Sequence, residues 1–213
     1  MTIVRGFPGR LSLVRGGKVG ETGCMATHWI WIALYWAWIV GEVLVLVVTR
    51  TRRGGGEVRD RGSLLVLWFT IFGSMFVGSW VGAINEPTKF QAGRWFAYAC
   101  LGLLMLGLAI RWTAIYTLGK SFSANVAIHA TQKLNVSGLF RWMRHPSYTG
   151  LLLIFLAIGL DTHNWLGLGI IVGLPAAALL YRIHVEEAAL TGAFGAEYVE
   201  YTQRTKRLIP GIY

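Results

Sequence analysis

The sequence is poor in charge, and most of the charge it has is of one sign. Only ten of its 213 residues are acidic, against twenty basic ones, and charged residues make up 14% of the chain. Hydrophobic residues make up 54%, which is more than a soluble globular domain usually contains. Because low charge combined with long apolar runs is typical of polytopic membrane proteins, the composition predicts an integral membrane protein.

Further absences exclude several kinds of site. The two cysteines, Cys24 and Cys100, lie far apart without a CxxC pair, so neither a disulfide framework nor a zinc site is expected. The chain has no HExxH motif and no Rossmann glycine fingerprint, and we predict no metal. A net charge of +10 would suit a protein that binds nucleic acid. The basic residues, however, cluster between apolar runs, as they do in the cytoplasmic loops of membrane proteins. Since no zinc-finger or basic-helix signature is present, no nucleic-acid partner is expected.

Five apolar segments predict an all-α, polytopic membrane protein with about five transmembrane helices. Residues 1–27 form a basic tail that we expect to be disordered, and Met25, just before the first apolar run, is a candidate for the natural start. The basic loop 49–63 is expected in the cytoplasm, which places the C-terminal amphipathic helix there too. Residues 28–118 would hold three spans, and 119–213 the catalytic region with two more. The predicted spans are 29–48, 64–84, 95–118, 148–160 and 165–184.

Three residues inside these spans are exceptions to their apolar character. Glu42 is either a functional carboxylate or a protonated acid bonded to a neighbouring helix. Arg111 is expected to extend its side chain to the cytoplasmic side of the membrane. Pro175 is expected to bend or interrupt the fifth helix.

A second group of charges predicts a site at one membrane face. Arg144 and His145 stand immediately before Pro146, which is well placed to begin a helix. Cationic groups at a helix start favour a bound anion, although a basic juxtamembrane anchor explains them equally well. Glu186 and Glu187 are expected at the same face, where the two kinds of charge could hold a zwitterion such as S-adenosylmethionine. The alternative is that these carboxylates begin a tail helix and pair with Lys206 or Arg207 at the surface.

The C-terminal half combines several motifs that are specific only together. LGKSFS at residues 118–123 is followed by SGLFR at 137–141 and RHPSYTG at 144–150. Glu186-Glu187, Phe194-Gly195 and a final Leu-Ile-Pro at 208–210 complete the set. From about residue 118 to 213 the chain resembles the isoprenylcysteine carboxyl methyltransferase family, which also includes phospholipid N-methyltransferases. The first 117 residues match only as hydrophobic spans.

The resemblance implies an integral membrane methyltransferase that binds S-adenosylmethionine on the cytoplasmic face and takes a lipophilic or prenylated acceptor from the bilayer. Arg182, Glu187 and Arg204 are the candidate catalytic residues, with the two arginines orienting an acceptor carboxylate. Gln132 and Phe140 depart from the histidine and tyrosine that many members have there, which leaves the cofactor contacts or the acceptor specificity open. The candidate cofactor-binding residues are Gln132, Leu134, Gly138, Phe140, Arg144, His145, Tyr148, Glu186 and Glu187.

The reaction itself stays open between two acceptors. A prenylcysteine-like carboxylate is already ionised and needs positioning more than a base, whereas a phosphatidylethanolamine-type amine must lose a proton, for which Glu187 or His145 is available. We favour O-methylation of the carboxylate. The alternatives are N-methylation of a phospholipid, an NADPH-dependent sterol-type reductase and a non-enzymatic membrane protein. Membrane lipids are expected partners, and the sequence does not determine the oligomeric state.

Overall fold

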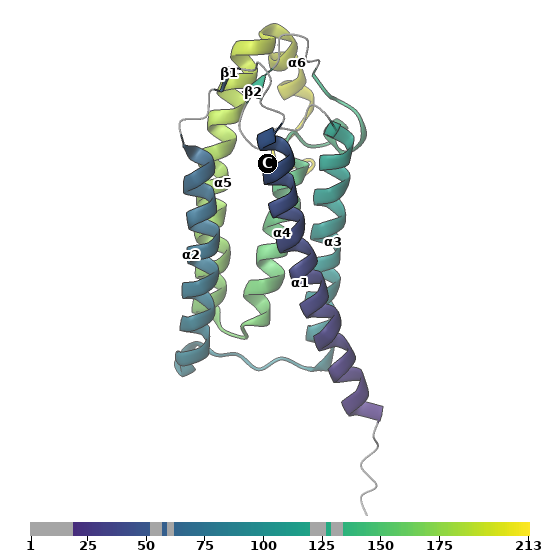
Figure 1. Cartoon of the computed structure of the whole chain (residues 1–213), viewed down its shortest axis with the longest axis vertical. Coiled ribbons are helices and arrows are strands. Elements are labelled where there is room, and N and C mark those ends of the chain that lie inside the picture. The colour runs from purple at the N-terminus through teal and green to yellow at the C-terminus, as the bar shows by residue number, and fades with distance from the viewer. Residues whose placement is uncertain (1–18, 52–56, 59–61, 120–126, 129–133) are drawn as a thin grey trace, which may run out of the picture.

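The structure, a computed structural model, describes residues 19–51, 57–58, 62–119, 127–128 and 134–213. Five long helices run alternately up and down one bundle, as Figure 1 shows, and they confirm the all-α class. A short helix α6 (Ala196–Arg204), two 3-10 turns, η1 (Glu86–Thr88) and η3 (Gly138–Arg141), and two paired strands, β1 (Glu57–Val58) and β2 (Ala127–Ile128), complete the described chain. The long helices are α1 (Val19–Thr51), α2 (Ser63–Ile84), α3 (Arg94–Leu118), α4 (Pro146–Asp161) and α5 (Trp165–Phe194).

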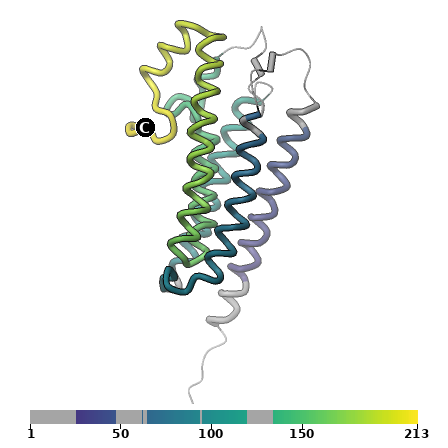
Figure 2. The backbone as a smooth tube through the Cα atoms, turned by 90° about the vertical axis from the view of Figure 1, so that its left-hand side faces the viewer, coloured from purple at the N-terminus to yellow at the C-terminus, as the bar shows by residue number. Residues whose placement is uncertain are grey.

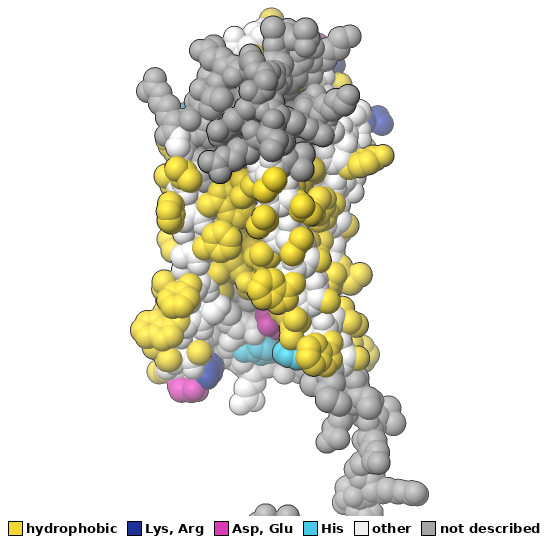
Figure 3. Space-filling model, viewed as in Figure 1, with side chains coloured by type: hydrophobic (Ala, Val, Ile, Leu, Met, Phe, Trp, Pro, Cys, Tyr) yellow, Lys and Arg dark blue, Asp and Glu magenta, His cyan; other side chains and the backbone are white. Residues whose placement is uncertain are grey.

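Four of the long helices contain an apolar segment long enough to cross a membrane. These segments are Ala26–Val47, Leu65–Ile84, Trp95–Leu118 and Trp165–Phe194. Helix α4 is apolar as well, but its 16 residues extend only about 24 Å, less than a hydrocarbon core of about 30 Å. Figure 3 shows hydrophobic side chains covering the middle of the visible face. The predicted fourth span is therefore a helix, but one shorter than a full crossing.

Two helices extend beyond the predicted boundaries. Helix α1 begins at Val19, so residues 19–27, expected to be part of a disordered tail, are helical, while residues 1–18 lie outside the described part of the chain. Helix α5 continues to Phe194, passing the predicted end at His184. It also passes Pro175 without an interruption, because a buried proline in a packed membrane helix can leave its freed carbonyl to neighbouring groups. The bend that we expected there as the other possibility stays a prediction.

Small residues allow the helices to approach closely. Helix α3 packs against α4 where Gly107 meets Gly150, and a Cβ atom added to Gly150 would lie only 2.7 Å from the carbonyl oxygen of Gly107. Helix α2 packs against α5 at Gly78 and Gly167 in the same way. In a bilayer the hydrophobic effect does not favour helix–helix contacts over helix–lipid contacts, so close packing of this kind drives helix association.

The charged residues inside the spans pair with each other. Two N–H groups of Arg111 on α3 donate to the two carboxylate oxygens of Glu42 on α1, and Trp38 Nε1 donates to Glu42 at 3.0 Å. Arg111 also donates to Ser147 Oγ at 2.6 Å, on the first turn of α4. Its predicted extension to the membrane surface is wrong, since the side chain is 8% exposed and its partner lies within the bundle. The expected contact of Glu42 with a neighbouring helix is confirmed, whereas its protonation and a functional role stay predictions.

The alternating helices bring the ends of α1, α3 and α5 and the beginnings of α2 and α4 to one end of the bundle. Helix α6 and the C-terminal segment lie at this same end, where Figure 2 shows the chain turning back after α5. The described polar residues predicted to form a site lie near these helix ends or on α6, so the fold brings them to the same end of the bundle.

Candidate functional site

The arginine and histidine before α4 are held in place by the C-terminal segment of the chain. The backbone N–H of Arg144 donates to the carbonyl of Lys206 at 2.7 Å, and that of His145 donates to the carbonyl of Arg207 at 2.9 Å. One turn into α4, Thr149 Oγ1 donates to the carbonyl of Leu208 at 2.8 Å. Pro146 occupies the first turn of the helix, where its missing N–H leaves no donor unpaired. The C-terminal segment thus fixes the orientation of both side chains.

Glu187 lies at the centre of the charged groups. Arg144 Nε donates to its Oε1 at 2.8 Å, and Arg207 Nε donates to its Oε2 at 3.0 Å. His145 Nε2 lies 3.4 Å from Oε1. The hydrogen bond to Glu187 also raises the pKa of Arg207. Because the Glu187 side chain is only 12% exposed, these partners are what offset the cost of burying its charge.

Glu186 forms a second chain of contacts beside the first. Tyr148 Oη donates to Glu186 Oε2 at 2.7 Å and accepts a hydrogen bond from Arg182 Nε at 3.0 Å. The rings of His145 and Tyr148 stack with centroids 5.5 Å apart, which joins the two chains. Arg182 is 3% exposed, whereas the side chain of Glu186 is 29% exposed. Glu186 is therefore the carboxylate that an incoming ligand reaches more easily.

Six of the predicted site residues come together in this way: Arg144, His145, Tyr148, Arg182, Glu186 and Glu187. We call these six residues the charged cluster. The pairing of Glu187 with Arg207, which belonged to the alternative interpretation, is present, while the binding of a zwitterion stays a prediction. Neither carboxylate begins a tail helix, because both lie on α5.

The other predicted residues lie outside the charged cluster. Arg204 is exposed and pairs with Glu200 on its own helix. Phe140 is buried in η3, and its carbonyl accepts a hydrogen bond from Tyr201 at 2.7 Å. Gly138 begins η3 with a positive φ of 56°, and Leu134 lies in the irregular segment before it. Gln132 is outside the described residues.

Sequence reasoning missed three contributors to this end of the molecule. Arg111 and Ser147 link the membrane-embedded ion pair to the first turn of α4. Tyr198 on α6 is buried one helical turn before Thr202, whose carbonyl accepts a hydrogen bond from Arg144. An arginine inside an apolar run was a signal for the first link, but nothing in the local sequence distinguishes Tyr198 from other aromatic residues of an amphipathic helix.

The charged cluster has the chemistry to bind a zwitterion. Carboxylates at Glu186 and Glu187 attract an ammonium or sulfonium group, while guanidinium groups at Arg144 and Arg182 attract a carboxylate. The aromatic face of Tyr148 beside them suits a cation as well. Across the described residues, no group of three or more histidine, cysteine or acidic side chains is placed to hold a metal ion.

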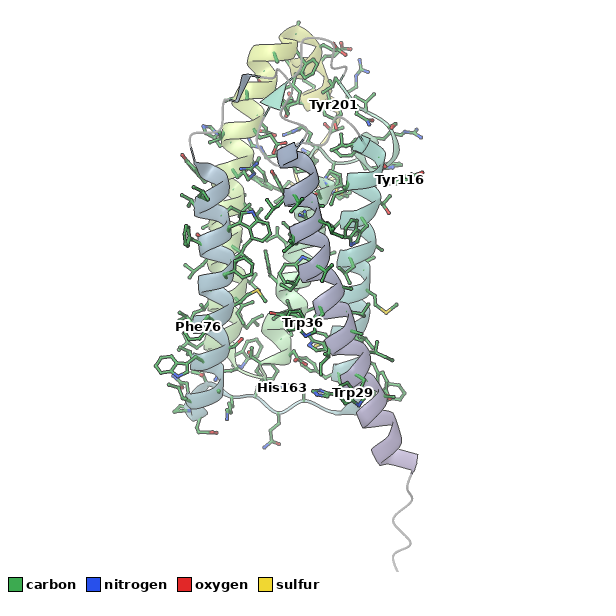
Figure 4. All side chains as sticks on the ribbon, in the orientation of Figure 1. Trp29, Trp36, Phe76, Tyr116, His163 and Tyr201 are labelled. Atoms are coloured by element: carbon green, nitrogen blue, oxygen red, sulfur yellow. The ribbon has the colours of Figure 1, made fainter. Side chains whose placement is uncertain are left out.

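A cleft of about 720 Å³ lies elsewhere, between α1 and α2. Its lining is almost wholly apolar and aromatic and includes Trp36 and Phe76. In Figure 4 these two residues lie in the half of the bundle away from Tyr201, which marks the end with the charged cluster. The cleft is therefore separate from the polar site.

Comparisons with known proteins agree with the resemblance seen in the sequence. A sequence model of the isoprenylcysteine carboxyl methyltransferase (ICMT) family matches residues 100–192. The chain is 33% identical over 129 residues to protein-S-isoprenylcysteine O-methyltransferase B of Arabidopsis thaliana, covering 54% of this chain and 60% of that protein. It is 36% identical over 115 residues to protein-S-isoprenylcysteine O-methyltransferase of Saccharomyces cerevisiae, covering 53% of this chain and 48% of that protein.

A solved structure is also similar. The eukaryotic intramembrane Ras methyltransferase ICMT superposes with a TM-score of 0.58 at 27% identity, over 68% of this chain and 52% of that one. The matches thus span roughly half of the relatives' length, from 48% to 60%. Together with the apolar helices, they confirm an integral membrane protein of the ICMT fold. The matched residues 100–192 contain all six residues of the charged cluster.

Proposed function

We propose that, as the match of residues 100–192 to the ICMT family suggests, the chain is a membrane methyltransferase that uses S-adenosylmethionine to methylate the carboxylate of a lipophilic, prenylcysteine-like acceptor. The observation that carries the proposal is the convergence of Arg144-His145 and Tyr148 with Glu186-Glu187 at one end of the bundle. The basic loop 49–63 supports a cytoplasmic location for this end.

The residues present fit the methyl donor. Its amino-acid end carries an ammonium and a carboxylate group, which match the carboxylates and arginines of the charged cluster. Glu186 is held by Tyr148 yet remains 29% exposed, so an ammonium group can approach it from the side away from the phenol. When bound, S-adenosylmethionine supplies an electrophilic methyl group on a sulfonium.

The protein's part in such a transfer is positioning. Arg182, which is buried and bonded to the Tyr148 hydroxyl, is the candidate for orienting an acceptor carboxylate. A carboxylate oxygen needs no base, because it is already ionised and loses its charge as the ester forms. Arg182 should bind the carboxylate only moderately, since an interaction stronger in the ground state than in the transition state slows the reaction. Burial of the charged cluster excludes water that would otherwise solvate the acceptor.

The first experiment is calorimetric binding of S-adenosylmethionine and of NADPH to the full chain in detergent. We expect saturable binding of S-adenosylmethionine that Glu186→Ala and His145→Ala both weaken, because each removes a member of the charged cluster. Glu200→Ala, which removes an exposed carboxylate on α6, is the matched control and should bind as the wild type does. Binding of NADPH alone would favour a reductase, and binding of neither ligand to folded protein would favour a non-enzymatic membrane protein.

A transfer assay then identifies the acceptor. Membranes containing the protein are supplied with S-adenosylmethionine carrying a labelled methyl group and with either N-acetyl-S-farnesylcysteine or phosphatidylethanolamine. We expect the label to appear in the farnesylcysteine and to be released by mild alkali, because alkali hydrolyses a methyl ester. Alkali-resistant label in the phospholipid would instead establish N-methylation.

A further inference from the structure

The hydroxyl of Tyr198 is buried without a hydrogen-bond partner. Tyr198 is 2% exposed, and its Oη bonds to none of the residues that the structure describes. The second tyrosine of the same helix, Tyr201, is also buried but donates to the carbonyl of Phe140 at 2.7 Å. Buried hydroxyls nearly always have a partner, because leaving one unpaired sacrifices the hydrogen bonds it made to water. An exception of this kind requires an explanation.

The position of Tyr198 supplies one. It lies one helical turn before Thr202, whose carbonyl accepts a hydrogen bond from Arg144 at 3.1 Å. Arg144 in turn bonds to Glu187, so the face of α6 that carries Tyr198 and Thr202 lies beside the charged cluster. Burial, followed by the charge of Glu187, raises the pKa of Tyr198, which keeps the phenol protonated and able to donate.

The class of ligand follows from this geometry. A neutral O–H donor at the edge of a mixed cluster of carboxylates and guanidinium groups suits an acceptor oxygen on a zwitterion, and the carboxylate of an amino acid is the strongest such acceptor. We infer that the Tyr198 hydroxyl donates a hydrogen bond to the carboxylate of bound S-adenosylmethionine. This inference rests on the proposed function and adds a binding residue outside the region matched by the family model.

The test compares Tyr198→Phe with Tyr201→Phe in the full chain in detergent. Calorimetry measures binding of S-adenosylhomocysteine, which has the amino-acid end, and of 5′-methylthioadenosine, which lacks it. We expect Tyr198→Phe to weaken S-adenosylhomocysteine by about tenfold or more, as loss of a hydrogen bond to a charged group implies, and to leave methylthioadenosine unchanged. Without ligand, its thermal midpoint should equal or exceed that of the wild type, because an unpaired polar group is removed.

The control behaves in the opposite way if the reasoning is correct. Tyr201→Phe removes a hydrogen bond that is already made, so it should lower the thermal midpoint of the ligand-free protein. Unchanged binding of S-adenosylhomocysteine by Tyr198→Phe, equal weakening of both ligands, or a midpoint lowered as in the control would each overturn the inference alone. A wild type that binds neither nucleoside would overturn the proposed function and the inference together.

Discussion

The ion pair between Glu42 and Arg111 offers a sharp test of the fold. Glu42 is 5% exposed and accepts hydrogen bonds from Arg111 and from the indole of Trp38, while Arg111 also donates to Ser147. Glu42→Ala leaves the guanidinium buried with Ser147 as its remaining partner among these residues and leaves the Trp38 N–H unpaired. Breaking a buried pair from one side costs about 3–5 kcal/mol of the free energy of unfolding. Because the Trp38 N–H loses its acceptor as well, we expect a loss at the upper end of that range.

The assay is a double-substitution cycle. The free energy of unfolding is measured by titrating the detergent-solubilised protein with sodium dodecyl sulfate, first for Glu42→Ala and then, for the cycle, for Glu42→Leu, Arg111→Leu and the two combined. We expect the combined variant to lose much less stability than the sum of the single variants, because it leaves no unpaired charge in the bundle. Glu200→Ala is the control, since its exposed pair with Arg204 should contribute less than about 1 kcal/mol.

Two results would refute this reasoning. One is that Glu42→Ala loses no more free energy of unfolding than Glu200→Ala does. The other is that the losses of the two single variants in the cycle add up to the loss of the combined variant. Since Arg111 bonds to Ser147 on the first turn of α4, we also expect Glu42→Leu to weaken S-adenosylmethionine binding by tilting the helix that carries Tyr148. Unaltered binding by a folded variant would show that the ion pair stabilises the bundle without positioning the site.

Two further predictions concern packing and pH. Gly150→Ala should lower the free energy of unfolding by about 1–3 kcal/mol, because its Cβ would overlap the backbone of α3. Gly102→Ala, where a Cβ meets nothing within 4 Å, should be neutral or slightly stabilising. Equal effects of the two substitutions in the unfolding titration would contradict the close approach of α3 and α4. Burial raises the pKa of Tyr201 to about 12, above the value of about 10 in the unfolded chain, so its contribution to stability is complete below about pH 10 and is lost as the pH rises through 12. The thermal midpoint should fall across this range in the wild type and less steeply in Tyr201→Phe, which has no hydroxyl to ionise, and parallel curves would contradict the assignment.

Much of the architecture could be read from the sequence. Apolar runs of sufficient length form helices in a bilayer because their backbone groups must bond within the segment, so the five helices and their alternation follow from hydropathy and loop composition. The charged cluster was accessible as well. Its residues stand at helix ends that the alternation brings to one side, and the motif combination identified Arg144, His145, Tyr148 and the two carboxylates together.

Helix ends and long-range partners were beyond the sequence. The long spans are apolar around most of their circumference, so the pattern does not state which face meets which neighbour, nor that Arg111 would turn inward to Glu42, 69 positions away. The same limit hid the role of α6, where two tyrosines of identical chemistry end up differently: Tyr201 bonds to Phe140, and Tyr198 is buried unpaired beside the charged cluster. The sequence by itself determined which segments enter the membrane and which polar residues gather at one end. Only the tertiary structure decided which of those residues touch, because rotation and tilt of packed helices depend on contacts that local sequence does not encode.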